Sequence, residues 1–130
     1  MNTSIAPHAA LVQRLADQFG AIWIDEFSIA GWTAQSGDRV VLLAGDPLRF
    51  PEGLDVAAIL PELMKAFPGR FRVAVVPRAN EEAIARRYGS TRWPTLLFFR
   101  DGQHITSIGG MKDWDVYLRD VDAALTRSAA

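Results

Sequence analysis

The chain has 130 residues and no cysteine, with 49% hydrophobic residues, 22% charged residues and a formal net charge of −1. This length and composition predict that residues 1–130 form a single globular domain with its own core, and they disfavour a nucleic-acid or membrane-surface binder, which would be basic. The lack of cysteine excludes a disulfide, a thiolate nucleophile and a cysteine-ligated metal site.

The first part of the chain is expected to alternate helices and strands. Apolar residues recur on one face from His8 to Phe19, which predicts an amphipathic helix. Ala21–Ile24 is a short apolar run that predicts a first strand, and Asp25 is placed to cap a short helix that ends near Gln35. Val40–Ala44 is a continuous apolar run, as expected for a strand that is covered on both faces of its sheet.

The middle of the chain repeats this alternation. The apolar spacing of Leu54–Phe67 predicts a helix, and Pro61 should kink it because proline removes a backbone hydrogen bond. Phe71–Val76 predicts the next strand. Asn80 is then expected to cap a short helix over Glu81–Tyr88, whose first turn carries negative charge.

The last part of the chain predicts a hairpin followed by a helix. Trp93-Pro94 opens the apolar run Thr95–Phe99, and proline fits the start of a strand because it cannot donate to the ladder. Asp101-Gly102 is a typical two-residue hairpin turn, which leads into a last strand over His104–Ile108. The spacing of Asp113–Leu125 predicts a final amphipathic helix, in which Trp114 is expected in the core.

This order of elements predicts an α/β fold with a central mixed sheet of four to five strands, flanked by helices and preceded by an extra N-terminal helix. From about residue 21 to residue 126 the pattern resembles thioredoxin. The resemblance is carried by Tyr88-Gly89, by Pro94-Thr95 and by the apolar run that ends in the turn at Gly102. It implies a thioredoxin-like fold in which the peptide bond before Pro94 is cis.

The redox residues of thioredoxin are missing from this sequence. Pro61, within I-L-P-E-L, matches the proline of the thioredoxin active-site helix. Counting back from it, the two cysteines would fall at Gly53 and Val56, and the buried acid of thioredoxin would fall at Val41. Because disulfide exchange needs a thiolate, we expect no thiol-disulfide activity.

A longer loop stands above this position. We call Gly45–Glu52 the lip; it replaces a much shorter connection in thioredoxin. The lip, the aromatic residue before Pro94 and the absence of cysteine together resemble the hydrogenase accessory proteins of the HyaE/HupG type. The positions that fit this group are Asp46, Pro47, Arg49, Pro51, Glu52, Arg92, Pro94 and Trp114.

The resemblance implies a cytoplasmic chaperone in [NiFe] hydrogenase maturation that binds the small-subunit precursor at its twin-arginine signal peptide. The residues expected to bind this partner are Asp46, Pro47, Arg49, Glu52, Arg92, Trp93 and Pro94. Carboxylates are suited to the peptide's arginines because they take a guanidinium bidentately. An X-Pro corner is suited to an extended peptide because it can present backbone groups to an added strand.

Each of these residues also has a purely structural interpretation. Trp93-Pro94 is equally compatible with a packed turn that starts a strand, and Asp46 with a local turn into Pro47. Asp55 is better explained as a helix cap than as a partner contact, and Arg49 and Arg92 are commonly solvated charges. A structural adaptor that uses the fold only for assembly is therefore the alternative function.

We expect neither an enzyme nor a cofactor. His8 and His104 are the only histidines and lie far apart in the sequence, so no metal site is expected. A glutathione-dependent enzyme on this fold would need a nucleophile near residues 53–56, where the sequence is Gly-Leu-Asp-Val. The first ten residues lack the features of a signal peptide and no apolar run is long enough for a bilayer, so we expect a cytoplasmic protein.

Overall fold

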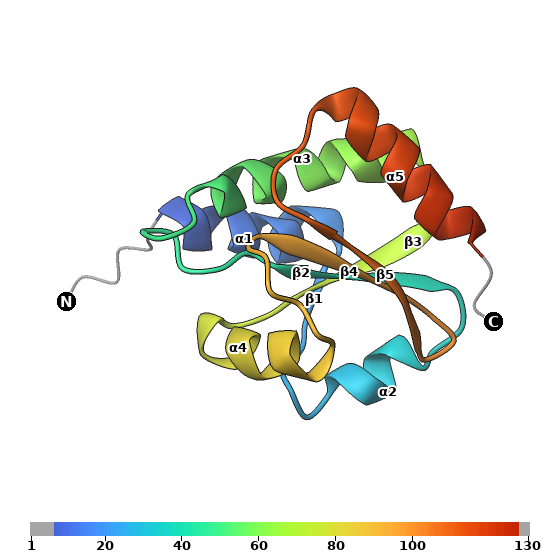
Figure 1. Ribbon diagram of the computed structural model, residues 1–130, viewed down its shortest axis with the longest axis horizontal. Helices are drawn as coiled ribbons and strands as arrows, with labels where there is room; N and C mark the ends of the chain where they lie inside the picture. The colour runs from blue at the N-terminus through green and yellow to red at the C-terminus, as the bar shows by residue number, and fades with distance from the viewer. Residues whose placement is uncertain (1–6, 128–130) are drawn as a thin grey trace.

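The computed structural model describes residues 7–127, in which helices and strands alternate (Figure 1). The helices of this part are α1 (Pro7–Phe19), α2 (Ile29–Thr33), α3 (Glu52–Ala66), α4 (Arg78–Arg87) and α5 (Trp114–Thr126). The strands are β1 (Ile22–Trp23), β2 (Asp38–Leu43), β3 (Phe71–Val75), β4 (Thr95–Arg100) and β5 (Gln103–Gly109).

The strands form one mixed sheet in the order β1-β3-β2-β4-β5. β1, β3 and β2 run parallel, whereas β4 is antiparallel to both β2 and β5. This arrangement confirms the predicted mixed sheet with an antiparallel edge pair. The carboxyl ends of the three parallel strands lie at one end of the sheet, and the lip and the start of α4 follow directly from there.

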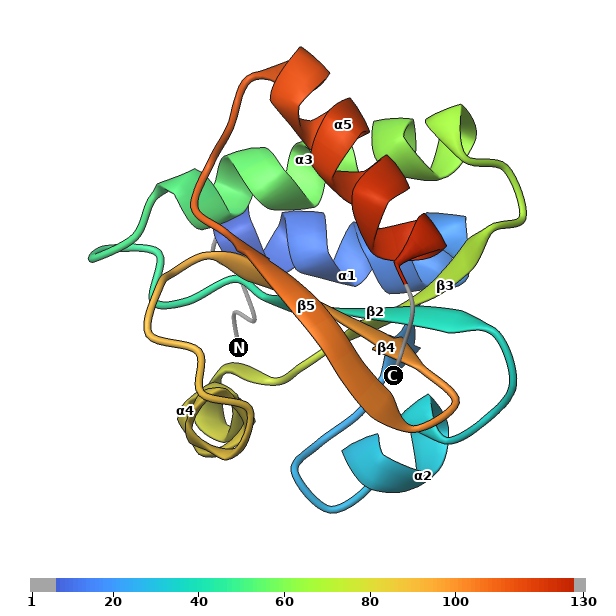
Figure 2. The same cartoon turned by 45° about the vertical axis from the view of Figure 1, so that its right-hand side comes forward.

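Helices cover both faces of the sheet. α1, α3 and α5 lie on one face, and α2 and α4 lie on the other (Figures 1 and 2). The two faces have separate apolar cores because side chains of β2 alternate between them. Val40 and Leu42 belong to the core under α1, α3 and α5, whereas Val41 and Leu43 belong to the core under α2 and α4.

Of the two predicted helix caps, the one at Asn80 is wrong and the one at Asp25 lies one turn ahead of α2. Asp25 stands three residues before Ser28, the residue that precedes α2. Its Oδ1 accepts hydrogen bonds from the amides of Phe27 (2.9 Å) and Ser28 (2.8 Å), and its carbonyl oxygen accepts one from the amide of Ile29 (3.0 Å), so it caps the turn that leads into α2. Asn80 lies inside the first turn of α4. That helix already begins after Pro77, whose ψ of 142° is extended.

The final helix buries only part of the predicted apolar face: Val121 and Leu125 are buried as the spacing predicted. Tyr117 and Val121 are fully buried, whereas Leu118 is only partly buried. Trp114, expected in the core, is 40% exposed and lies beside Ile59 of α3 rather than under the sheet. The prediction failed because Trp114 starts the helix, where it covers α3 from outside.

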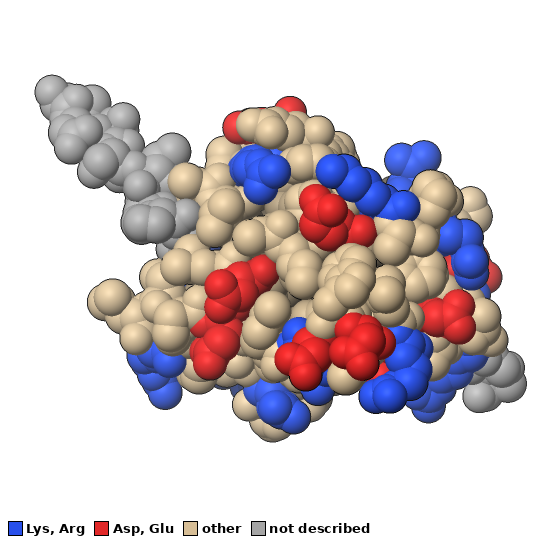
Figure 3. Space-filling view, turned by 90° about the horizontal axis from the view of Figure 1, so that it is seen from above, with Lys and Arg blue, Asp and Glu red and all other residues tan. Residues whose placement is uncertain are grey.

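The charged side chains over α3 and α5 are mixed in sign. Figure 3, which looks down on this face, shows arginine, lysine, aspartate and glutamate interspersed without an extended patch of one sign. None of the helices within residues 7–127 is long and apolar enough to cross a membrane.

Candidate functional site

The lip folds back on itself at the carboxyl end of the sheet. The amide of Phe50 donates to the carbonyl oxygen of Asp46 at 2.7 Å, and the amide of Leu48 donates to Oδ1 of Asp46 at 2.9 Å. Asp46 therefore forms a local turn into Pro47, as its structural interpretation predicted. One oxygen of its carboxylate accepts a hydrogen bond inside the loop. Leu48 stands at the tip and is 92% exposed.

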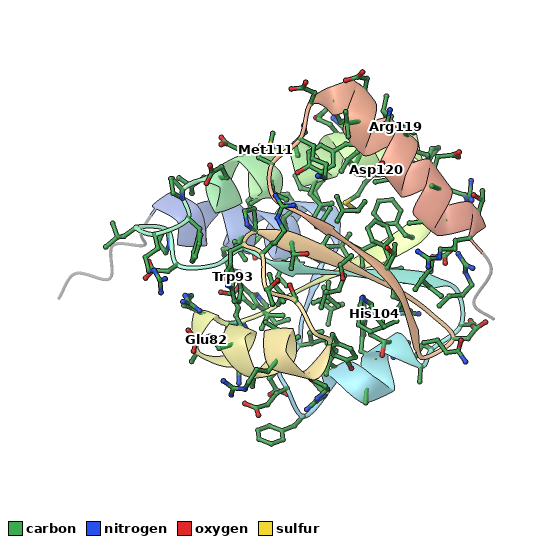
Figure 4. All side chains as sticks on the ribbon, viewed as in Figure 1. Glu82, Trp93, His104, Met111, Arg119 and Asp120 are labelled. Atoms are coloured by element: carbon green, nitrogen blue, oxygen red, sulfur yellow. The ribbon has the colours of Figure 1, made fainter. Side chains whose placement is uncertain are left out.

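An aromatic pair connects the lip to the segment before β4. The rings of Phe50 and Trp93 lie 6.1 Å apart at an angle of 30°. Arg49 stacks on Phe50 at 5.2 Å, and Arg78 of α4 stacks on Trp93 at 5.8 Å. We call these four residues the aromatic corner; Trp93 lies at the end of the sheet above α4 (Figure 4).

The glycine that starts the lip makes this contact possible. Gly45 has a φ of +84°, and a Cβ atom there would lie 3.2 Å from Cε3 of Trp93. Both its left-handed backbone and its closeness to the ring favour glycine at this position. The sequence places a glycine where the indole of Trp93 lies directly against the backbone.

The peptide bond between Trp93 and Pro94 is cis, as the resemblance to thioredoxin implied. Pro94 is buried, and its carbonyl oxygen accepts a hydrogen bond from the amide of Gly110 at 2.7 Å. That carbonyl is therefore engaged within the chain. Within residues 7–127, the backbone N–H and C=O of Trp93 make no hydrogen bond.

Arg92 does not join the aromatic corner. Its side chain lies against Gly109 and Gly110, where added Cβ atoms would come within 3.0 Å of it. It lines a separate cavity of about 370 Å³ together with Lys112 and Asp120. The structure thus brings together the lip, Trp93 and Pro94, and places Arg92 in different surroundings.

The start of α3 carries Gly53 and Val56, the two positions that the resemblance to thioredoxin assigns to the redox cysteines. Glu52 and Asp55 are exposed in the first turn, where negative charge is favourable. Gly53 is buried, and a Cβ atom there would lie 2.3 Å from the carbonyl oxygen of Ala44. Because real Cβ atoms do not approach a backbone oxygen so closely, any side chain at this position is excluded without movement of the backbone.

A buried carboxylate that the sequence analysis missed stands behind the lip. Glu81 of α4 is 3% exposed, and it accepts hydrogen bonds from the amides of Ala44 (2.7 Å) and Gly45 (3.3 Å). Arg78 pairs with the same carboxylate at 3.3 Å. Burial raises the pKa of the Glu81 carboxyl to about 7, although the two amides and Arg78 oppose this shift.

Glu81 had a signal in the sequence. It shares one face of α4 with Ile84 and Ala85, both buried, at the spacing of three and four residues that marks an inward stripe. A glutamate on an apolar stripe predicts a buried, hydrogen-bonded carboxylate. The acidic first turn by itself indicates only a favourable charge at the amino end of the helix.

His104, the histidine whose side chain the structure describes, is a packing residue. His104 lies on the α2 and α4 side of β5 (Figure 4), with its ring 5.3 Å from Phe99 and 5.6 Å from Tyr88. Burial lowers the pKa of His104. In residues 7–127 no group of three or more acidic or histidine side chains could hold a metal, and the side chain of His8 lies outside the described residues.

The fold and the site together define a thioredoxin-like domain without cysteine. A mutant thioredoxin of Halobacterium salinarum superposes with a TM-score of 0.64 at 20% identity, covering 85% of this chain and 94% of its own. This similarity shows the fold alone and confirms the predicted fold class.

The chain belongs to the HyaE family of hydrogenase expression proteins. Residues 11–117 match the family described as "Hydrogenase-1 expression protein HyaE". The hydrogenase expression/formation protein HoxO of Cupriavidus necator is 47% identical over 88% of this chain and 73% of its own length. HupG of Bradyrhizobium diazoefficiens is 41% identical over 85% of this chain and 74% of its own.

A solved structure supports the same family. The hydrogenase expression/formation protein HupG of Rhodopseudomonas palustris is 33% identical, with a TM-score of 0.57, over 80% of this chain and 94% of its own. The family relationship supports a role of this chain in hydrogenase maturation, as the resemblance to HyaE/HupG proteins implied.

Proposed function

We propose that this chain is a cytoplasmic, non-catalytic chaperone of [NiFe] hydrogenase maturation that binds the small-subunit precursor at its twin-arginine signal peptide. The observation that carries the proposal is the aromatic corner. It joins the lip to Trp93 at the end of the sheet where thioredoxin acts on its protein substrates with cysteines that this chain lacks. The same end of the sheet, without cysteines, can still bind a protein partner although it cannot exchange disulfides.

The corner can hold an extended peptide through its backbone and its apolar side chains. The unpaired N–H and C=O groups of Trp93 supply one donor and one acceptor for an added strand. The rings of Phe50 and Trp93 and the exposed side chain of Leu48 supply apolar contact for hydrophobic residues of the peptide.

The arginines of the peptide are assigned to carboxylates of the lip. Glu52 is exposed at the start of α3 and free to turn toward a ligand, whereas Asp46 already uses one oxygen inside the loop. Glu52 should therefore contribute more than Asp46. A charge-assisted hydrogen bond contributes about 1.5–3 kcal/mol when shielded and less than about 1 kcal/mol when exposed.

Calorimetry with a synthetic signal peptide tests this proposal. We would titrate the wild-type peptide and an Arg→Lys peptide into the wild-type protein, each at low and high salt. We expect weaker binding of the lysine peptide, because lysine lacks the planar fork, and weaker binding at high salt. Asp46→Asn with Glu52→Gln should weaken binding of the arginine peptide and reduce its salt dependence.

The matched control is Glu62→Gln. Glu62 is an exposed acid on the same helix α3, paired with Lys65 at 3.4 Å, so this variant changes the net charge without touching the lip. Equal affinities of both peptides at both salt concentrations would reject capture of arginine by acids. Absence of peptide binding, with recovery of another protein from cells, would instead favour the structural adaptor.

A further inference from the structure

Two arginines lie side by side at the amino end of the sheet, opposite the aromatic corner. Arg39 of β2 and Arg72 of β3 are register partners in the parallel pair, so their side chains leave the sheet on the same face. Arg39 is 6% exposed, whereas Arg72 is exposed. Both line a cavity of about 410 Å³, together with Trp32 and Gln35.

The chain supplies no carboxylate side chain to this pair of arginines. Every aspartate and glutamate of the sequence lies within the described residues, and none comes within 4.0 Å of either guanidinium. The acid next to Arg39, Asp38, pairs with Arg100 at 2.6 Å instead. The cavity is therefore lined by two positive charges without a negative side chain to balance them.

The buried guanidinium of Arg39 is incompletely hydrogen-bonded. It stacks on the ring of Trp32 at 4.9 Å, and its Nη2 donates to the carbonyl oxygen of Ser36 at 3.3 Å, but its Nε has no partner. Stacking occupies the flat face of a guanidinium and leaves the N–H groups on its edge available for a planar acceptor. Burial, and then the charge of Arg72, lower the pKa of Arg39.

A buried donor without an acceptor is unfavourable, and a charged one more so. We propose that the cavity between α2 and the amino ends of β2 and β3 binds an oxyanion group, a phosphate or a carboxylate. Arg72 and the free edge of Arg39 hold its oxygens, and the side-chain amide of Gln35 lines the same cavity. This site is separate from the aromatic corner and does not depend on the partner proposed there.

The test uses inorganic phosphate and acetate as probes, titrated at constant ionic strength with chloride as the reference anion. The readouts are the melting temperature and the side-chain Nε–H signals of arginine in ¹⁵N NMR spectra, with the Arg39 signal assigned from Arg39→Lys. The decisive variant is Arg72→Gln, because Arg72 is exposed and its loss leaves Arg39 in place. Arg70→Gln is the matched control, since exposed Arg70 lies outside the cavity lining.

We expect a saturable shift of the Arg39 signal and a higher melting temperature with at least one anion. Binding should weaken about tenfold or more in Arg72→Gln and stay unchanged in Arg70→Gln. A response to phosphate alone would assign the site to phosphate groups, and a response to acetate alone to carboxylates. Equal losses in the two variants, or the absence of saturable binding with either anion, would overturn the proposal.

Discussion

At the carboxyl end of the parallel strands, the carboxylate of Glu81 is buried and accepts hydrogen bonds from two amides and from Arg78. At the amino end, the guanidinium of Arg39 is almost equally buried, yet its Nε has no hydrogen-bond partner and no carboxylate lies within 4.0 Å of the guanidinium. One buried charge is satisfied within the chain, whereas the other is not.

The difference separates two uses of a buried charge. Glu81 joins α4 to the first residues of the lip, so it fixes the loop that carries the aromatic corner. The side chain of Arg39 does not link two segments in this way. The unpaired N–H group at its Nε indicates a place for a ligand. Changes to Glu81 and to the start of α3 should therefore show how firmly the carboxyl end is organised.

The largest effect is expected from removing the Glu81 side chain. Glu81→Ala leaves the buried amides of Ala44 and Gly45 without an acceptor, and Arg78 without its buried partner. We expect a loss of about 3–5 kcal/mol in the free energy of unfolding, measured by chemical denaturation. Glu82→Ala is the matched control: Glu82 is exposed and 3.8 Å from Arg78, so its loss should change stability by less than about 0.5 kcal/mol.

The pH dependence of stability gives the next largest effect. The pKa of Glu81 rises from 4.5 to about 7 on folding, so the folded state binds more protons between these values. The free energy of unfolding should therefore fall by up to about 3 kcal/mol as the pH rises through this window, and level off above it. Glu81→Gln should remove this slope.

His104 acts with the opposite sign, because burial lowers its pKa. Its contribution is common to the wild type and to Glu81→Gln, and it cancels when the two curves are subtracted. If the difference between them did not change with pH, the carboxyl of Glu81 would not be the group that titrates.

Gly53→Ala should have a smaller effect. Its new Cβ atom would meet the carbonyl oxygen of Ala44 at 2.3 Å, so the start of α3 must move away from β2. Such overpacking typically costs about 1–3 kcal/mol. Gly31→Ala in α2 is the control, because a Cβ atom there meets nothing within 4 Å. Equal stabilities of the two variants would show that the carbonyl group of Ala44 leaves room for a side chain at position 53.

The sequence predicted those parts of the fold that depend on local pattern. The apolar runs predicted the strands, and the spacing of apolar residues after Pro7 predicted α1. The pair Asp101-Gly102 predicted the hairpin between β4 and β5. The error at Asn80 arose because its side chain can make several hydrogen bonds, and it donates to Glu26 instead of capping α4.

The site was predicted only in part, since its contacts join distant segments. The lip and Trp93-Pro94 were identified as candidates from the sequence, but their contact through Phe50 was not. Glu81 bonds to an amide 37 positions away, and Arg39 meets Arg72 only because β2 pairs with β3. The spacing of apolar residues predicts each helix or strand separately. It does not indicate which distant residues come into contact in the folded chain.

We propose that the aromatic corner binds the partner, and the affinities of two single variants for the small-subunit precursor are the most direct test. Trp93→Ala removes a ring of the corner, whereas Phe27→Ala removes an 85% exposed ring from the turn between β1 and α2. With both variants shown to be folded by circular dichroism, we expect affinity to fall about tenfold or more in Trp93→Ala and to stay at the wild-type value in Phe27→Ala. Wild-type affinity in Trp93→Ala would contradict the claim.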